Sequence, residues 1–187
     1  MDAAVASFTA LAQLPPSANA DLALYTSAVL VLVPILRSMG LSMRIAAAEL
    51  EKNAVRVQRS GFLTLAALVE SERAQGLHLS DTSASTALLW SHRAMLFVEK
   101  MLAGVVSSGK ELKVAAKEAY AETLAPHHTW GVRQLFTLSL AALPTTQAFV
   151  EALDKEARFV QNVRRLSTLV ARIRECNART AATIGRR

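Results

Sequence analysis

Glycine and proline residues divide this chain of 187 residues into successive segments, each long enough to form an α-helix. None of these segments shows the polar–apolar alternation of a half-buried strand. The sequence therefore predicts an all-α fold of about seven or eight helices, forming one domain over residues 1–187. Helices are expected over residues 3–14, 21–39, 42–60, 63–75, 83–107, 110–124, 129–143 and from 145 to about 177.

The segment 85–105 is apolar on nearly every side when its residues are placed 100° apart. A helix of that kind is usually central and buried, with other helices packed around it. The longest apolar run, residues 22–36, is shorter than the roughly 20 residues that cross a bilayer, and it contains Pro34. It is expected to form a buried helix, kinked or ended early at the proline.

Composition narrows the class of protein. Hydrophobic residues make up 52% of the chain, enough for a substantial core. A single cysteine, Cys176, excludes a disulfide framework and a cysteine-based zinc site. A single cysteine suits a reducing compartment, so we expect a cytoplasmic protein. We also expect a monomer. The N-terminus has Asp2 and no basic residues around it, which predicts no secretory signal.

Charge is distributed unevenly along the chain. Residues 1–153 carry 12 Lys and Arg against 12 Asp and Glu, whereas residues 154–187 carry nine against three. The basic segment from about residue 154 therefore supplies the whole net charge of +6. It suits an anionic membrane or simply a solvated helix face. Because Phe159 is the only aromatic residue in this segment, we do not expect nucleic acid as a partner.

Three polar residues border the apolar face of the expected helix at 42–60. Glu49, Asn53 and Arg56 are spaced i, i+4 and i+7, which places them in one row. A carboxylate, an amide and a guanidinium together can bind a polyhydroxyl or phosphate group. The alternative is an ordinary surface row whose charges pair with neighbours.

Further along, Trp90 offers either a platform for a sugar or a core side chain, and Arg93 follows one helical turn later. The adjacent histidines His127 and His128 have no nearby acid, which makes them poor metal ligands. The sequence contains no nucleophile beside a base and no phosphate-binding loop. We therefore expect neither an enzyme nor a bound cofactor or metal.

These residues occur in an order that resembles the glycolipid transfer protein family over about residues 32–153. The family pattern Asp-x3-Asn-x2-Lys corresponds to Glu49, Asn53 and Arg56. Its Leu-Leu-Trp-x-x-Arg run corresponds to residues 88–93, and its Tyr…His-x-Trp run corresponds to Tyr120, His128 and Trp130. Its Pro followed by Phe corresponds to Pro144 and Phe149.

The resemblance implies a two-layer helical sandwich, acting as a carrier or sensor that holds one sphingolipid and touches membranes transiently. Glu49, Asn53 and Arg56 would bind the headgroup and the lipid amide, Trp90 would stack on the first sugar, and His128 would bind the amide carbonyl oxygen. Trp130 would enter the membrane interface. The chain pocket would be lined by Phe136 and Phe149, with Phe97 and Met101 added from helical geometry.

Two features leave the headgroup open. Asn53 and Trp90 match the sugar-binding branch of the family, whereas the residues around Arg93 are more like the branch that carries ceramide-1-phosphate. Arginine in place of the family lysine at residue 56 also suits phosphate or sulfate. We favour a glycosphingolipid, with a phosphorylated or sulfated ceramide as the alternative. A helical protein-interaction module without lipid is the alternative from another class.

Overall fold

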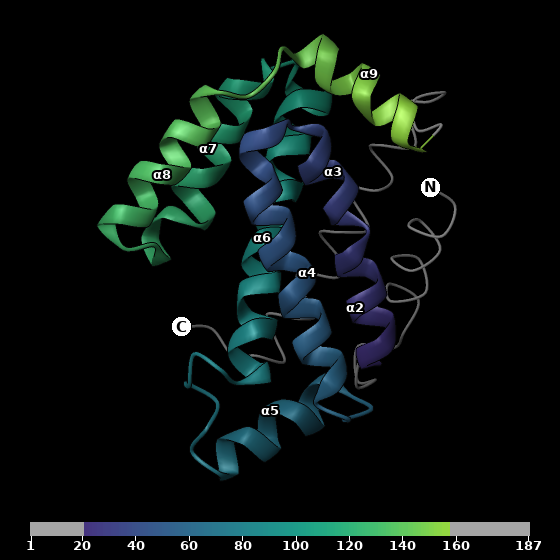
Figure 1. Cartoon of the computed structure of the whole chain (residues 1–187), viewed down its shortest axis with the longest axis vertical. Helices are drawn as coiled ribbons and strands as arrows, with labels where there is room; N and C mark the ends of the chain where they lie inside the picture. The colour runs from purple at the N-terminus through teal and green to yellow at the C-terminus, as the bar shows by residue number, and fades with distance from the viewer. Residues whose placement is uncertain (1–20, 158–187) are drawn as a thin grey trace.

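A computed structural model describes residues 21–157 of this chain. The helix expected over residues 3–14 and most of the basic segment lie outside that range. Every regular element among the described residues is helical, which confirms the predicted all-α class (Figure 1). The elements are α2 (Leu22–Leu30), α3 (Leu32–Ser38), η1 (Leu41–Met43), α4 (Arg44–Arg59), α5 (Leu65–Ala74), α6 (Ala84–Ser108), α7 (Leu112–Thr123), η2 (Ala125–His127), α8 (Trp130–Ala141) and α9 (Thr146–Ala157).

The apolar run 22–36 forms two helices rather than one. Asp21 caps α2 by accepting a hydrogen bond from the Leu24 N–H at 2.9 Å, as its place in the sequence predicts. The chain breaks at Val31, and Pro34 lies in the first turn of α3. A proline lacks the N–H and clashes with the carbonyl four residues earlier, which explains a break just before this point.

Helix α6 lies at the centre of the molecule, as its apolar sequence predicts. It packs against α7 on one side and α4 on the other, with α2 and α3 beyond α4 (Figure 1). Its N-terminus is capped twice. The Ser83 hydroxyl accepts from the Thr86 N–H, and the Glu72 carboxylate of α5 accepts from the N–H groups of Ala84 and Ser85. These contacts fix the start of the helix that carries Trp90.

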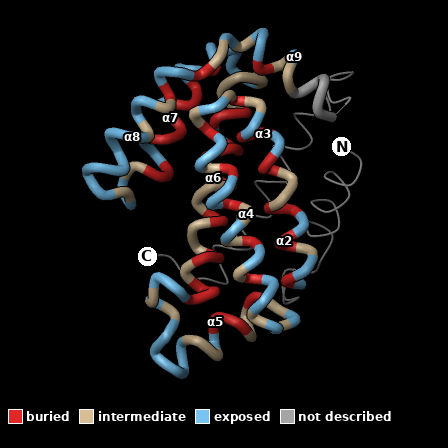
Figure 2. The backbone as a smooth tube through the Cα atoms, in the orientation of Figure 1, coloured by how far each residue is buried: buried red, intermediate tan, exposed pale blue. Residues whose placement is uncertain are grey.

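Helix α8 differs from the other helices because most of it is exposed (Figure 2). Among residues 130–141, only Leu140 is buried, and Phe136 and Ser139 are intermediate. The Ser42 hydroxyl donates to the carbonyl oxygen of Ser139 at 3.1 Å and connects α8 to η1. An exposed helix that carries several large apolar side chains is unusual in a monomeric protein and indicates an interaction surface.

Candidate functional site

Five ring side chains from three helices and one junction meet beside α6. This aromatic cluster contains Trp90 and Phe97 of α6, Tyr120 of α7, His128 of the α7–α8 junction and Phe136 of α8. Tyr120 and Phe136 stack with their ring centres 4.4 Å apart, and Phe97 meets Phe136 edge-on at 5.8 Å. Trp90 and His128 stack at 5.5 Å with 26° between their planes.

The junction between α7 and α8 places His128 in the cluster. Pro126 lies at the start of η2, the short turn that follows α7, and the backbone becomes extended at His128. The ring Nδ1 of His128 lies 3.1 Å from the Tyr120 hydroxyl. The Arg133 Nε donates to the His128 carbonyl oxygen at 2.9 Å. His128 is therefore held through both its ring and its backbone.

Cationic side chains surround this cluster. The Arg93 guanidinium lies over the Trp90 ring, 4.8 Å from its centre, and burial lowers its pKa. Burial lowers the pKa of His128 below the usual value, and the charges of His127, Arg133 and Arg93 lower it further. His128 is thus a neutral imidazole at pH 7, in surroundings that attract anions.

The row on α4 lies beside α6 but makes separate contacts. Glu49 is exposed and pairs with Lys52 at 3.4 Å, and Asn53 is half-buried. Arg56 donates from Nη1 to the Asp81 carbonyl oxygen at 2.8 Å, in the loop before α6. Within residues 21–157, the side chains of Arg56 and Lys52 bond to Asp81 and Glu49 and not to the aromatic cluster. The structure therefore brings together Trp90, His128 and Arg93, and leaves Arg56 on a neighbouring part of the surface.

The residues predicted for a chain pocket lie in the interior. Phe97, Met101 and Phe149 are almost fully buried, and Phe136 is half-buried against the core. These side chains are packed into the common core, so a hydrocarbon chain would have to separate them. Phe97 and Phe136 are the two that also belong to the aromatic cluster.

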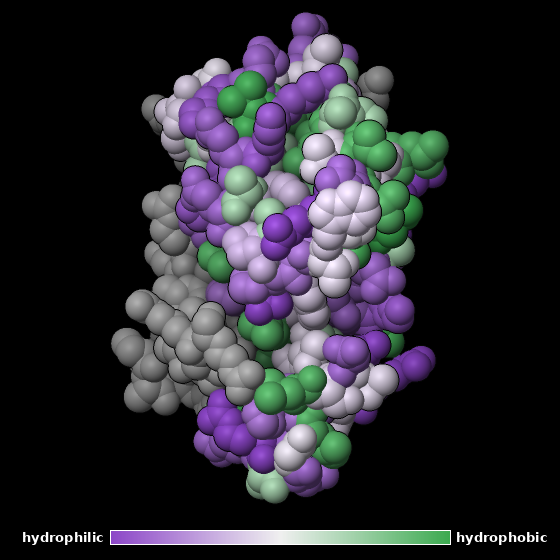
Figure 3. All heavy atoms as spheres, turned by 90° about the vertical axis from the view of Figure 1, so that its left-hand side faces the viewer, coloured by the Kyte–Doolittle hydropathy of each residue, from purple (hydrophilic) through white to green (hydrophobic). Residues whose placement is uncertain are grey.

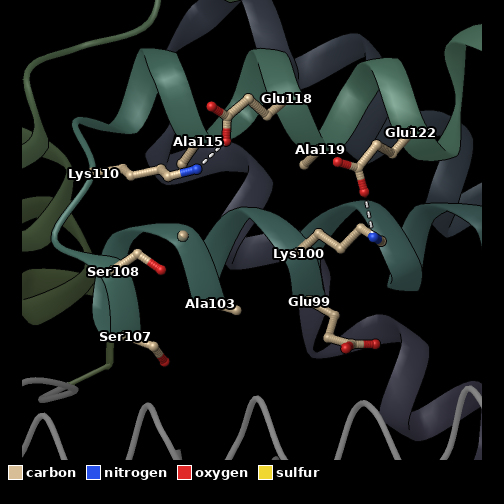
Figure 4. A pocket seen from close by; sticks show the side chains of 11 residues that line it. Glu99, Lys100, Ala103, Ser107, Ser108, Lys110, Ala115, Glu118, Ala119 and Glu122 are labelled. Atoms are coloured by element: carbon tan, nitrogen blue, oxygen red, sulfur yellow. Dashed lines mark hydrogen bonds and ion pairs between the residues drawn. The ribbon is translucent and has the colours of Figure 1, made fainter.

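A groove between α6 and α7 does not fit a chain pocket. It holds about 650 Å³, and two ion pairs cross it, Lys100 with Glu122 and Lys110 with Glu118 (Figure 4). Its lining contains none of the predicted chain-pocket residues. Charged walls of this kind would have to lose their hydration to take an alkyl chain, which opposes a role in lipid binding.

Trp130 begins α8 and is 78% exposed. Other large apolar side chains of α8, η1 and α4 are also exposed, and Figure 3 shows hydrophobic groups gathered along one edge of the face on which α8 lies. We call these residues the apolar face: Leu41, Ile45, Trp130, Leu135 and Leu138.

Sequence reasoning gave no role to three residues that shape the site. Tyr120 was noted only as part of a pattern, although its hydroxyl lies beside the His128 ring. Arg133 follows His128 by five residues, and the turn between them directs its side chain back to the His128 carbonyl. Glu72 caps α6 from a helix 12 residues away in sequence. For Arg133, the signal was a cation in the first turn of a helix, where the macrodipole disfavours it.

A model of the glycolipid transfer protein family matches residues 20–155. The chain belongs to this family. It is 38% identical over 92 residues to human pleckstrin homology domain-containing family A member 8, a match that spans 49% of this chain and 18% of that protein. The chain thus spans less than a quarter of the length of the first curated relatives that it matches.

Two solved structures show the same fold. A variant of Arabidopsis ACD11 (accelerated-cell-death 11) complexed with C12 ceramide-1-phosphate has a TM-score of 0.88 at 20% identity, covering 97% of this chain and 92% of that one. A structure described as showing how FAPP2 selects simple glycosphingolipids has a TM-score of 0.75 at 24% identity, covering 95% and 87%. The expected family and fold are therefore confirmed. No helix among the described residues is long and apolar enough to cross a membrane.

Proposed function

We propose that this protein binds one sphingolipid and carries it between membranes, with the headgroup beside Trp90 and the hydrocarbon chains in the interior. Membership of a lipid transfer family supports this function. The chains of such a lipid cost about 0.8 kcal/mol per CH₂ to expose to water, so a carrier must enclose them. Phe97 is the most deeply buried member of the aromatic cluster, and Met101 is buried one helical turn further along α6, so both offer the apolar surroundings that the chains need.

The observation that carries the proposal is the contact between Tyr120 and His128. We assign the Tyr120 hydroxyl as donor to Nδ1 of the neutral ring, which leaves the Nε2–H of His128 as a donor of its own. In our proposal, this N–H donates to the carbonyl oxygen of the lipid amide. Every ceramide-based lipid has that oxygen, so the contact would select sphingolipids whatever their headgroup.

For the headgroup we propose a glycosphingolipid. A sugar that stacks on Trp90 would share the ring with Arg93, whose guanidinium can donate hydrogen bonds to sugar hydroxyls. Asn53 is half-buried on α4, the neighbour of α6, and its amide can both donate and accept.

Ceramide-1-phosphate is the second candidate, and a specific observation favours it. Two cations flank His128, because Arg133 donates to its carbonyl oxygen and Arg93 lies over the Trp90 ring that stacks on it. A guanidinium binds a phosphate through two parallel hydrogen bonds, which suits Arg93 at the edge of the site. The two candidates share the amide contact and differ in what Arg93 and Trp90 bind.

The apolar face provides the contact with the membrane in this proposal. Trp130 combines an apolar ring with an N–H donor, the kind of side chain that favours the interface between lipid and water. Leu135 and Leu138, on the same exposed helix, would enter the outer part of the bilayer. Such binding is reversible because the buried area is small, and a carrier must leave the membrane again.

A vesicle transfer assay tests the function. Fluorescent galactosylceramide and fluorescent ceramide-1-phosphate are offered in parallel, with a fluorescent phosphatidylcholine as the lipid that lacks the amide. We expect transfer of galactosylceramide and none of phosphatidylcholine. Transfer of ceramide-1-phosphate alone would support the second candidate. If the folded protein transfers none of the three, the carrier function is refuted and an interaction module is favoured.

A further inference from the structure

A separate hollow lies where α4 ends, between α4, α5 and the loop that precedes α6. It holds about 400 Å³, near the lower end of the roughly 300–1,000 Å³ of small-molecule pockets. Its walls combine two arginines, hydroxyl and amide groups, and the apolar side chains of Phe62 and Leu77. We call it the α4–α5 hollow. Its lining suits a small polar ligand that carries a negative charge.

The positive charge of the α4–α5 hollow is not neutralised within the described part of the chain. Arg56 is held by one hydrogen bond to the Asp81 carbonyl oxygen, which leaves most of its N–H groups available. The guanidinium of Arg59, also in the last turn of α4, has no hydrogen-bond or ion-pair partner there. The single acid in the lining, Glu72, uses both carboxylate oxygens to cap α6.

The α4–α5 hollow lies at the N-terminal end of α6, the end nearer to Trp90. Helices α4 and α6 pack side by side, and α4 ends near α5, where α6 begins (Figure 1). Trp90 is six positions beyond Ala84, which lines the hollow, so the two lie roughly 9 Å apart along the axis of α6. Asn53 and Arg59 are also six positions apart on α4. That distance is about the reach of a disaccharide whose first sugar lies on Trp90.

From this arrangement we infer that the α4–α5 hollow binds an anionic group (sulfate, phosphate or carboxylate) on the outer sugar of a glycosphingolipid. The inference rests on the proposed function and narrows its substrate class to acidic glycosphingolipids with more than one sugar. Arg59 and Arg56 donate charge-assisted hydrogen bonds to the anionic group. The hydroxyl and amide groups of the lining bind the sugar that carries it.

The test compares lactosylceramide with its 3′-sulfated form by measuring how each partitions from vesicles to the protein. The variant is Arg59→Ala. The matched control is Arg73→Ala, which removes an exposed arginine from the last turn of α5 outside the lining. We expect the wild-type protein to prefer the sulfated lipid. Arg59→Ala should reduce that preference about tenfold and Arg73→Ala should leave it unchanged, and added salt should weaken it.

Equal partition of the two lipids into the wild-type protein overturns the inference, as does an unchanged preference in Arg59→Ala. If neither lactosylceramide leaves the vesicles while galactosylceramide or ceramide-1-phosphate does, the inference fails and the proposed function stands. If none of the four lipids leaves, the proposed function fails as well. Free lactose 3′-sulfate distinguishes the source of the anion. If it binds in a manner that depends on Arg59 while the sulfated lipid is not preferred, the hollow takes a soluble anion and the assignment to a lipid headgroup is wrong.

Discussion

Replacing His128 by leucine tests the central contact of the proposed site. The substitution removes the Nε2–H donor and the acceptor of the Tyr120 hydroxyl, and leaves an apolar side chain of similar size. In the lipid complex, the amide carbonyl oxygen would then lie in a partly buried position without a donor. An unsatisfied buried polar group costs about 1–3 kcal/mol. At roughly 1.4 kcal/mol per factor of ten, the affinity should fall about 5- to 150-fold.

The assay measures the equilibrium partition of galactosylceramide and ceramide-1-phosphate from vesicles to the wild-type protein and to His128→Leu. Both lipids should lose affinity by a similar factor, because both contain the amide. Two further variants separate the causes. His128→Gln restores a side-chain N–H and should recover part of the affinity, whereas Tyr120→Phe removes only the hydroxyl that orients the ring and should have a smaller effect than His128→Leu.

A loss confined to one of the two headgroups would refute the role of His128 in binding the amide. An equal loss in Tyr120→Phe and His128→Leu would show that the donor depends entirely on the orientation of the ring. Circular dichroism must show that each variant keeps its helical content, because His128 also stacks on Trp90. The reasoning would also fail if His128→Leu bound both lipids as well as the wild-type protein does.

Further predictions concern the site, the membrane surface and the packing of α6. Trp90→Ala should abolish binding of galactosylceramide while the helical content is retained, and unchanged transfer would refute the stacking role. Trp130→Ala should slow transfer and weaken binding to vesicles without changing affinity for a soluble short-chain lipid, since this ring is exposed. The folded protein holds the pKa of His128 below its ordinary value of about 6.5, so protonation below that pH favours the unfolded chain. The free energy of unfolding should therefore decrease as the pH falls below about 6.5. Between pH 7.5 and 5, the Tm of His128→Gln should fall less than that of the wild-type protein. Gly104→Ala places a Cβ 2.9 Å from the Cβ of Ala115 on α7 and should lower the free energy of unfolding, measured by urea denaturation, by about 1–3 kcal/mol. Gly131→Ala is the control, because its Cβ enters open space and should not lower that free energy.

Sequence reasoning located the helices well because their ends depend on local chemistry. Asp21 and Ser83 accept hydrogen bonds from N–H groups three residues ahead, and Gly109 takes the left-handed conformation with φ of 62° after α6. Such signals are contained in a few consecutive residues. The same reasoning predicted a kink or an early end at Pro34 but not its exact place. The helix breaks at Val31, three residues earlier, because the proline clashes with a carbonyl of the preceding turn.

From helical spacing alone, the candidate site could be predicted only where its residues share one helix, whereas the meeting of Trp90 with His128 was expected from the family resemblance. Glu49, Asn53 and Arg56 form a row because their spacing fixes it, whereas the position of Arg56 against Asp81 depends on how a distant loop returns to α4. Likewise, the contact of Tyr120 with His128 depends on the turn between α7 and α8. Relations between elements require tertiary structure, which helical periodicity does not contain.

The arrangement of α8 connects the two surfaces that the proposed function requires. Its outward side carries the exposed Trp130 and Leu135, whereas its half-buried Phe136 packs on Tyr120 and His128 and meets Phe97. A hydrocarbon chain that enters between α6 and α8 must separate Phe97 from Phe136. Only Leu140 of α8 is buried, and elements with so few buried side chains typically open at lower cost than the core. Contact of its outward side with a bilayer would therefore act on the helix whose inward side closes the interior.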